Sequence, residues 1–353
     1  MSPGITSTNC ILHPSLGNLC DAAAISIPSS PLVHGSFVEH RPYYVHLSVT
    51  GRCNARCAGC VNSDVTFRNS DRSWLSPEND TNPIRDAKAI IRLLEQIGEK
   101  EIVVSFYGGE PLLLPEMIEQ VISYLQSAGH PFQLKHMIYT NGQLLGRVID
   151  RYPRLIPRIW LWSVSIDGTR EQHNAIRLGT DLEIIHQSLT ALKPVRTGTV
   201  LMWSTIREEQ SLLDCFYEFL YLHKNGLADL FFWHWVETEQ AFSDLHSYAK
   251  SYEQDLRVIM NAFVDRLAED ELLPIIHICE LILYILTAKQ RGSSACAVET
   301  ARNFDIMGGK VHPCADLPPE YAIGYIDATG EPYVNPTDLD SLVSYKEDLG
   351  FYA

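Results

Sequence analysis

Apolar and polar positions follow two different periods along the middle of the chain. Short runs of mostly apolar residues are typical of buried strands, and the stretches between them repeat apolar positions with helical spacing. Strands are predicted at residues 43–49, 102–106, 136–139, 159–166, 199–203 and 230–236. Helices are predicted at residues 82–97, 115–128, 181–192 and 210–223.

This alternation predicts the fold class α/β. Near-continuous apolar strands followed by helices indicate a parallel sheet that helices cover on one side. Six such units predict a partial (β/α)6 barrel, similar to a TIM barrel but open. In such barrels the reactive groups gather at the C-terminal ends of the strands. The polar residues at these ends are therefore expected to converge on one pocket.

Beyond residue 242 the pattern changes, and it predicts two long helices at residues 244–269 and 272–290. A segment with Cys296 and Cys314 follows, in which Gly308 and Gly309 predict a tight hairpin turn. We therefore divide the chain into an N-terminal arm, a barrel, and a helical linker with a small auxiliary domain. Their predicted ranges are 1–40, 41–243 and 244–353.

The formal net charge of the 353-residue chain is −15, from 43 acidic and 28 basic residues. This acidic excess argues against a nucleic-acid partner, whose affinity depends on the neutralisation of phosphates. Residues 272–286 form the longest nearly apolar stretch, which is too short to cross a bilayer. No membrane partner is therefore expected. Nine cysteines without a secretory lead at Met1 predict metal or redox chemistry in a reducing cytoplasm.

Cys53, Cys57 and Cys60 form a C-x3-C-x2-C run soon after the first predicted strand. Three thiolates at this spacing can hold three corners of a cubic [4Fe–4S] cluster and leave one iron open for a substrate or cofactor. A structural zinc site is the alternative, because closely spaced cysteines also bind zinc. Zinc sites normally bring a second ligand pair shortly downstream, whereas the next cysteine here is Cys215.

Three further motifs follow predicted strands in order, and they are Gly108-Gly109-Glu110-Pro111, Tyr139-Thr140-Asn141-Gly142 and Ser163-Val164-Ser165-Ile166-Asp167-Gly168. Together with the cysteine run, they resemble the successive strand-end motifs of the radical S-adenosylmethionine (SAM) enzymes. The resemblance covers residues from about 43 to 240. It implies the same open barrel, one [4Fe–4S] cluster held by the three cysteines, and SAM as a cofactor.

The resemblance also implies which residues bind SAM. It assigns cofactor binding to Gly108, Gly109, Glu110, Pro111, Asn141, Ser165 and Arg177. Backbone carbonyls of the first motif would bind the amino group of SAM, while Ser165 and Arg177 would bind its carboxylate and ribose. The alternatives are an ordinary strand–turn–helix for the first motif and a solvated surface position for Arg177.

Two carboxylates at strand ends, Asp167 and Glu237, are the candidate catalytic residues. Alternation along the sixth predicted strand places His234 on one face, and Trp233, Trp235 and Glu237 on the other. The tryptophans are more readily explained as core residues, and His234 as a buried, satisfied histidine.

The C-terminal segment around Cys296 and Cys314 resembles the opening of a SPASM or twitch domain, the auxiliary iron–sulfur module of many radical SAM enzymes. This resemblance implies that both cysteines bind an auxiliary [4Fe–4S] cluster. Such a cluster needs four ligands, and no cysteine follows Cys314. Two explanations stay open. Either the module recruits cysteines among Cys10, Cys20, Cys215 and Cys279, or the chain ends before its last ligands. Two buried free cysteines in a hairpin are the alternative to any cluster.

The family resemblance implies a function. Such an enzyme cleaves SAM reductively to a 5′-deoxyadenosyl radical and abstracts hydrogen from a ribosomally synthesised peptide or protein, and it uses a reductant such as flavodoxin or ferredoxin. The alternative within the family is a dehydrogenase or epimerase of a small-molecule alcohol or sugar. A non-catalytic electron carrier is disfavoured by the Gly-Gly-Glu-Pro motif.

Overall fold

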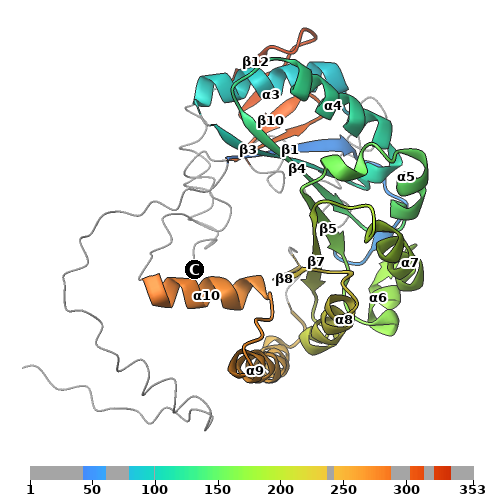
Figure 1. Ribbon diagram of the computed structural model, residues 1–353, viewed down its shortest axis with the longest axis vertical. Coiled ribbons are helices and arrows are strands. Elements are labelled where there is room, and N and C mark those ends of the chain that lie inside the picture. The colour runs from blue at the N-terminus through green and yellow to red at the C-terminus, as the bar shows by residue number, and fades with distance from the viewer. Residues whose placement is uncertain are drawn as a thin grey trace, which may run out of the picture.

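Six parallel strands form the centre of the computed structural model, which describes residues 43–60, 79–98, 100–236, 242–287, 303–313 and 322–334. In sheet order they are β1 (Tyr43–Thr50), β3 (Glu101–Gly108), β4 (Gln133–Thr140), β5 (Leu161–Ser165), β7 (Thr199–Ile206) and β8 (Leu230–Trp235). Each pairs in parallel with the next. Within the described residues the sheet runs from edge to edge without closing, so the predicted open barrel is confirmed (Figure 1).

Helices cover the convex side of this curved sheet, as Figure 1 shows. The four predicted between the strands are α3 (Pro83–Ile97), α4 (Pro115–Ser127), α7 (Leu182–Leu192) and α8 (Leu212–Lys224). Side chains of Asn82, Asp181 and Ser211 accept hydrogen bonds from backbone N–H groups in the first turns of α3, α7 and α8. These caps satisfy amides that have no partner within a helix, which fixes where each helix begins.

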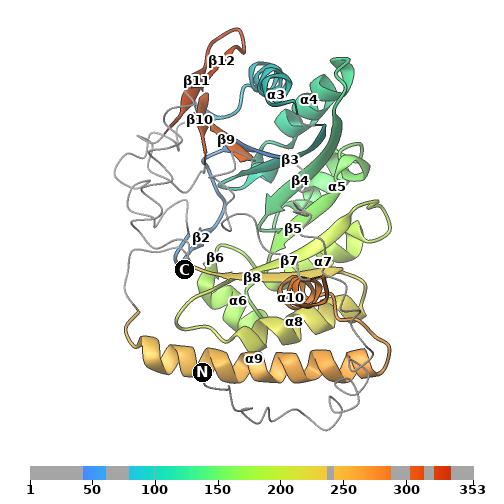
Figure 2. The same cartoon turned by 90° about the vertical axis from the view of Figure 1, so that its left-hand side faces the viewer.

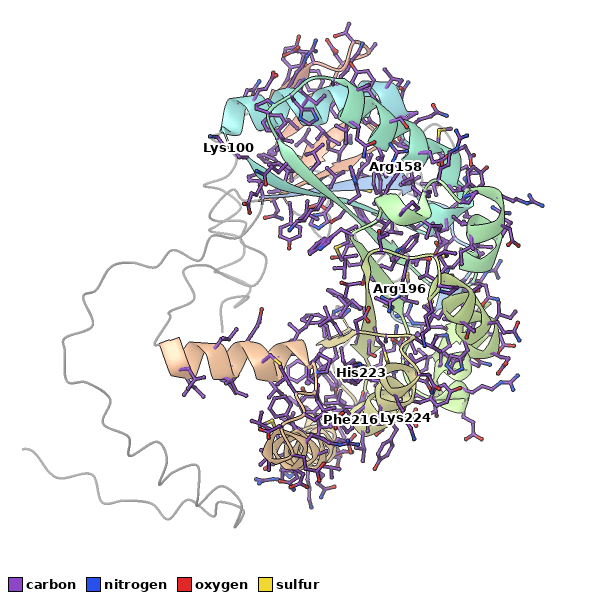
Figure 3. All side chains as sticks on the ribbon, in the orientation of Figure 1. Lys100, Arg158, Arg196, Phe216, His223 and Lys224 are labelled. Atoms are coloured by element: carbon purple, nitrogen blue, oxygen red, sulfur yellow. The ribbon has the colours of Figure 1, made fainter. Side chains whose placement is uncertain are left out.

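Four short helical elements were not predicted. They are the helices α5 (Leu145–Arg151) and α6 (Arg170–Ile176) and the 3-10 turns η3 (Pro111–Leu113) and η4 (Ile156–Arg158). Seven residues make barely two helical turns, so an apolar period has no length in which to show itself. The side chain of Arg158 donates to Ser123 Oγ (3.2 Å) and Gln126 Oε1 (2.8 Å) on α4, on the helical side of the sheet (Figure 3).

Side chains of the parallel strands alternate between two hydrophobic clusters, one on each face of the sheet. The larger cluster lies between the strands and the helices and contains the fully buried Val45, Leu47 and Phe231. The smaller one, around Val103 and Met137, lies on the opposite face, which we call the concave face. Both faces of the sheet are therefore apolar, as expected for parallel strands.

Two long helices follow the sixth parallel strand. They are α9 (Leu245–Ala268), which packs against α8, and α10 (Ile276–Thr287) on the concave side (Figures 1 and 2). The second helix begins later than predicted, because Pro274 and Ile275 run extended beside β8. Phe231 donates its N–H to the Pro274 carbonyl (3.0 Å), and Ile275 forms a parallel bridge with Phe231. No helix in the described ranges is both long and apolar enough to span a bilayer.

Four C-terminal strands extend the sheet beyond β1. They are β9 (Asn303–Met307), β10 (Lys310–His312), β11 (Gly324–Ile326) and β12 (Pro332–Val334). The first is parallel to β1, and the others add antiparallel. Gly308 and Gly309 have φ values of 57° and 76° between β9 and β10, so the predicted hairpin turn is confirmed. The described part of the C-terminal segment thus continues the sheet of the barrel, while the predicted domain boundaries stay predictions.

Candidate active site

The cysteine loop, residues 51–60, joins two distant parts of the barrel mouth. It leaves the C-terminal end of β1 and then forms the short strand β2 (Arg56–Cys57), which pairs antiparallel with β6 (Arg177–Leu178) after β5 (Figure 2). In this pairing Cys57 lies opposite Arg177. The Ala58 N–H also donates to the carbonyl of Ile176 (3.0 Å). The second half of the loop is therefore held by backbone hydrogen bonds to residues 176–178.

Gly108 and Gly109 hold the end of β3 against the start of the cysteine loop. The Gly109 N–H donates to the carbonyl of Thr50 (2.8 Å), and the Glu110 N–H donates to that of Arg52 (2.9 Å). A Cβ atom on Gly108 would lie 2.2 Å from the Thr50 oxygen, and one on Gly109 would lie 2.2 Å from the Arg52 oxygen. Only glycine allows this close approach. The glycines thus meet the cysteine loop itself, and their expected contact with SAM stays a prediction.

Glu110 is fully buried and ties the end of β3 to the turn after β4. Its carboxylate accepts hydrogen bonds from Thr140 Oγ1 (2.7 Å) and from the N–H groups of Asn141 (2.7 Å) and Leu112 (3.0 Å). Burial raises the pKa of Glu110 to about 7, although these hydrogen bonds oppose the shift. Pro111, the next residue, begins the turn η3. The side chain of Glu110 therefore positions neighbouring backbone.

Asn141 contacts the cysteine loop directly. Its Nδ2 donates to Asn54 Oδ1 (2.9 Å) and lies 3.9 Å from Cys53 Sγ, while its Oδ1 accepts from the Gln143 N–H (3.0 Å). The family resemblance places Asn141 among the cofactor-binding residues. In the structure it lies beside one of the three candidate cluster ligands.

Asp167 is the centre of a buried charge network. Its carboxylate accepts from Arg177 Nε (2.7 Å) and Nη2 (3.1 Å), from Arg207 Nη1 (2.8 Å) and from the Thr205 N–H (2.9 Å). Burial acts to raise the pKa of Asp167, but the two guanidinium groups outweigh it and hold this pKa below its ordinary value. Asp167 is thus an ionised anchor for two arginines.

The two arginines connect Asp167 to the cysteine loop. Arg177, which is almost fully buried, places Nη1 3.9 Å from Cys57 Sγ. Arg207 donates from Nε to the carbonyl of Ala58 (2.5 Å) and from Nη1 to Gln210 Oε1 (2.9 Å). Arg177 is therefore buried beside a candidate ligand, which contradicts its alternative placement on the solvated surface.

Sequence reasoning missed Arg207. The sequence offered one indication of its role, because Arg207 directly follows β7, at a strand end where barrels collect functional groups.

Ser165, a predicted SAM ligand, ends β5 and is partly buried. His173 is also fully buried here, and its Nδ1 accepts from the Asp167 N–H (3.2 Å). Burial lowers the pKa of His173 to about 3, so this imidazole is neutral.

The thiols of Cys53 and Cys57 are weaker acids than an ordinary cysteine. Loss of water around the sulfur raises the pKa of Cys53 to about 12, and Glu110 and the other two cysteines add to this rise. Burial also raises the pKa of Cys57, while Arg177 opposes it. Metal binding here would release protons. Within the described ranges, no three His, Cys, Asp or Glu side chains are grouped so as to hold a metal ion.

The cysteine loop carries the ligand type of an iron–sulfur cluster with one open iron, three thiols within eight residues, although the structure does not group these thiols around a common metal position. Three cysteines supply thiolates, and the guanidinium of Arg177 and the amide of Asn141 lie near two of the sulfurs, where positive and donor groups offset thiolate charge. Three predicted site residues, Glu237, Cys296 and Cys314, lie outside the described ranges.

The sixth strand has the predicted alternation. Phe231 and Trp233 are buried in the helical core, and Trp233 Nε1 donates to the Tyr252 hydroxyl (2.9 Å). His234 lies on the other face and is only partly buried, with its Nε2 2.9 Å from Thr205 Oγ1. The core role of Trp233 is confirmed, whereas Trp235 is exposed.

An open parallel barrel with a three-cysteine loop held across its C-terminal mouth defines a class of iron–sulfur barrel enzymes. Residues 47–206 match the sequence profile of the Radical SAM superfamily, and they include all four motifs. Residues 47–206, somewhat less than half of the chain, therefore form a radical SAM domain. The prediction of a radical SAM enzyme is thus confirmed at the level of the superfamily.

Two curated relatives illustrate the breadth of this similarity. The radical SAM cyclopropyl synthase TigE of Paramaledivibacter caminithermalis is 26% identical over 147 residues, which are 39% of this chain and 29% of that protein. The GTP 3′,8-cyclase of Saccharophagus degradans is 26% identical over 213 residues, which are 60% of this chain and 58% of that protein. The chain thus spans less than two thirds of the length of either relative.

A solved structure has the same fold. Native anSMEcpe with bound AdoMet superposes with a TM-score of 0.61 at 16% identity, covering 84% of this chain and 80% of that one. This likeness extends beyond the residues matched by the superfamily profile, and it concerns the fold alone.

Proposed function

We propose that the chain reductively cleaves SAM and abstracts hydrogen from a ribosomally synthesised peptide or protein. The observation that carries this proposal is the cysteine loop, held at the barrel mouth by Gly109, Asn141, Arg177 and Arg207. Strand ends from four parts of the chain converge on this one loop. Such convergence supports a preorganised reactive centre.

The residues of the mouth have distinct proposed roles. Cys53, Cys57 and Cys60 hold the cluster, which when reduced supplies the electron that cleaves bound SAM to a 5′-deoxyadenosyl radical. Ser165, the last residue of β5, and Arg177, the first residue of β6, bind the carboxylate and ribose of SAM. Asp167 acts through Arg177 and Arg207 as a positioning residue. Its ionised carboxylate already accepts four hydrogen bonds from these two arginines and from Thr205.

The peptide substrate is supported by a structural neighbour. Native anSMEcpe with bound AdoMet and the Cp18Cys peptide has a TM-score of 0.61 to this chain at 16% identity. A reductant such as flavodoxin or ferredoxin would supply the electron in the cytoplasm. Glu237 is retained as a candidate acid or base near the substrate.

A second candidate is a small-molecule substrate. Its support is the similarity to the GTP 3′,8-cyclase, which covers more of this chain than the similarity to TigE does. The formal charge of −15 speaks against a triphosphate, because phosphate recognition depends on spare cationic groups. A peptide therefore remains the first candidate.

An auxiliary cluster is part of the proposal for the C-terminal segment. Cys296 and Cys314 flank the β9–β10 hairpin in sequence, and β9 lies directly beside β1, the strand that leads into the cysteine loop. An iron content of about eight rather than about four per chain after reconstitution would support a second cubane.

Anaerobic incubation tests the proposed chemistry. Reconstituted chain mixed with SAM and dithionite should release 5′-deoxyadenosine, measured by mass spectrometry, and Cys57→Ala should release none. The matched control is Cys215→Ala, because Cys215 is buried on α8 within the hydrophobic core. Equal yields from the wild type and Cys57→Ala would refute the proposal. Parallel incubations with GTP would reveal the second candidate through a modified nucleotide.

A further inference from the structure

The concave face carries a continuous band of aromatic and imidazole rings. We call it the aromatic band, and its members are Tyr44, His46, Tyr107, Tyr139, Trp203, Phe232 and His234. Every one of these residues is partly buried. Their neighbours in sequence, such as Val45 and Met202, are fully buried on the helical side of the sheet. The band is therefore not part of the main core.

Trp203 lies at the centre of the band. Its ring centroid is 4.3 Å from that of Phe232, 5.4 Å from that of His234 and 5.5 Å from that of Tyr139. These separations are typical of tilted and edge-to-face aromatic pairs, which hold each ring in a fixed orientation. Such a set of fixed rings presents a rigid apolar surface.

The band lies immediately below the reactive end of the barrel. Trp203 is two residues before Thr205, whose N–H donates to Asp167 Oδ1 (2.9 Å). Two strand residues span about 7 Å. Asp167 in turn holds Arg177, which reaches the sulfur of Cys57. A group that stacks on Trp203 would thus lie two strand residues from Thr205, which bonds to the network that holds the cysteine loop.

The charges around the band disfavour a phosphate. Arg177 and Arg207 share the one carboxylate of Asp167, and Arg52 is paired with Asp80. These three guanidinium groups thus leave one positive charge, which suits the single carboxylate of SAM and not a triphosphate. At the other end of the band, Asp305 lies 3.5 Å from the His46 ring.

Lys135 shares the concave face by alternation. Lys135 precedes Tyr139 by four residues on β4, so it lies away from the barrel mouth. Its ammonium group is 5.0 Å from the centroid of the Trp160 ring. The band therefore combines apolar rings with a carboxylate, which suits an uncharged aromatic group and not a nucleoside triphosphate.

We infer that the aromatic band, centred on Trp203, binds an aromatic side chain of the peptide substrate by ring stacking. This inference rests on the proposed function, whose peptide substrate it narrows to one that presents an aromatic residue at the reactive centre. The rigid aromatic band favours a planar side chain of the substrate, because two flat rings lose little conformational freedom when they stack.

Ligand-observed NMR on the reconstituted chain with SAM tests the inference. The probes are N-acetyl-L-tyrosinamide, N-acetyl-L-alaninamide and GTP. The tyrosine probe should bind at least about fivefold more tightly than the alanine probe, and Trp203→Ala should weaken it about five- to tenfold, as loss of one aromatic pair and its contact area predicts. Trp203→Phe, which keeps a ring, should retain most of the affinity and guards against misfolding of the alanine variant.

Trp235→Ala is the matched control, because Trp235 is an exposed tryptophan on the other face of β8. It should leave the affinity of the tyrosine probe unchanged. Equal affinities for the two amides, an unaffected Trp203→Ala, or displacement of the tyrosine probe by GTP would each overturn the inference. Release of 5′-deoxyadenosine without peptide is measured in parallel. If that release persists while the probes fail to bind, the stacking inference falls and the proposed SAM chemistry stands.

Discussion

Glu110 and Asp167 show how burial gives two carboxylates opposite properties. Both are fully buried at strand ends, but only Asp167 has guanidinium partners. Without a cation, burial raises the pKa of Glu110 to about 7, whereas two arginines hold the pKa of Asp167 below its ordinary value. A motif that was expected to bind cofactor therefore contains a side chain that organises backbone and titrates near neutral pH.

The raised pKa of Glu110 predicts a pH dependence of stability. Because the folded pKa lies above the ordinary 4.5, the contribution of Glu110 to folding is complete below about pH 4.5 and is lost as the pH rises through about 7. The free energy of unfolding of the wild type should therefore fall relative to Glu110→Gln by up to about 3 kcal/mol between about pH 5 and pH 8. Denaturant titrations at several pH values measure this difference.

The matched control for that experiment is Glu183→Gln, which changes an exposed carboxylate on α7. Its stability should follow the wild type in parallel across the pH range. If the curve for Glu110→Gln also runs parallel to the wild type, the assigned titration of Glu110 is wrong.

At the scale of elements, the cysteine loop depends on close backbone contacts between strand ends. The segment after β3 bonds to the end of β1 at Thr50 and to the loop at Arg52, and β6 pairs with the loop at Cys57. The sequence predicted the six parallel strands and the longer helices because their periods are local. It did not predict the two-residue strands β2 and β6, whose pairing joins Cys57 to Arg177, 120 residues away.

Gly109→Ala tests the junction between β3 and the cysteine loop. A Cβ atom would lie 2.2 Å from the Arg52 carbonyl oxygen, which is backbone and cannot move aside without displacing the loop. The variant should keep the barrel, seen by circular dichroism, but retain less than about one iron per chain in place of about four. Iron analysis after anaerobic reconstitution measures the loss.

Gly98→Ala is the control for steric contact. Gly98 also has a positive φ (77°), but a Cβ atom added there would meet no other atom of the described residues within 4 Å. This variant should cost about 1 kcal/mol of stability through backbone strain and leave the iron content intact. Full iron retention by Gly109→Ala would show that the loop does not need its close contact with β3.

At the scale of the whole molecule, the site is assembled from segments that are far apart in sequence. Arg207 lies 40 residues from Asp167, and its side chain reaches the loop carbonyl of Ala58, 149 residues away. A lone arginine after a strand has no local pattern, so only the fold reveals its role. The parallel pairing of β9 with β1 was missed for the same reason. The cysteine run could be recognised because its spacing is local, and its role as a set of cluster ligands stays a prediction.

The central claim is that this loop holds a cluster whose open iron receives SAM. Electron paramagnetic resonance of the reduced, reconstituted chain tests it most directly. Addition of SAM should change the spectrum of the cluster, because the amino and carboxylate groups of SAM would enter the coordination of one iron. A chain with a full complement of about four irons whose spectrum is identical with and without saturating SAM would contradict the account.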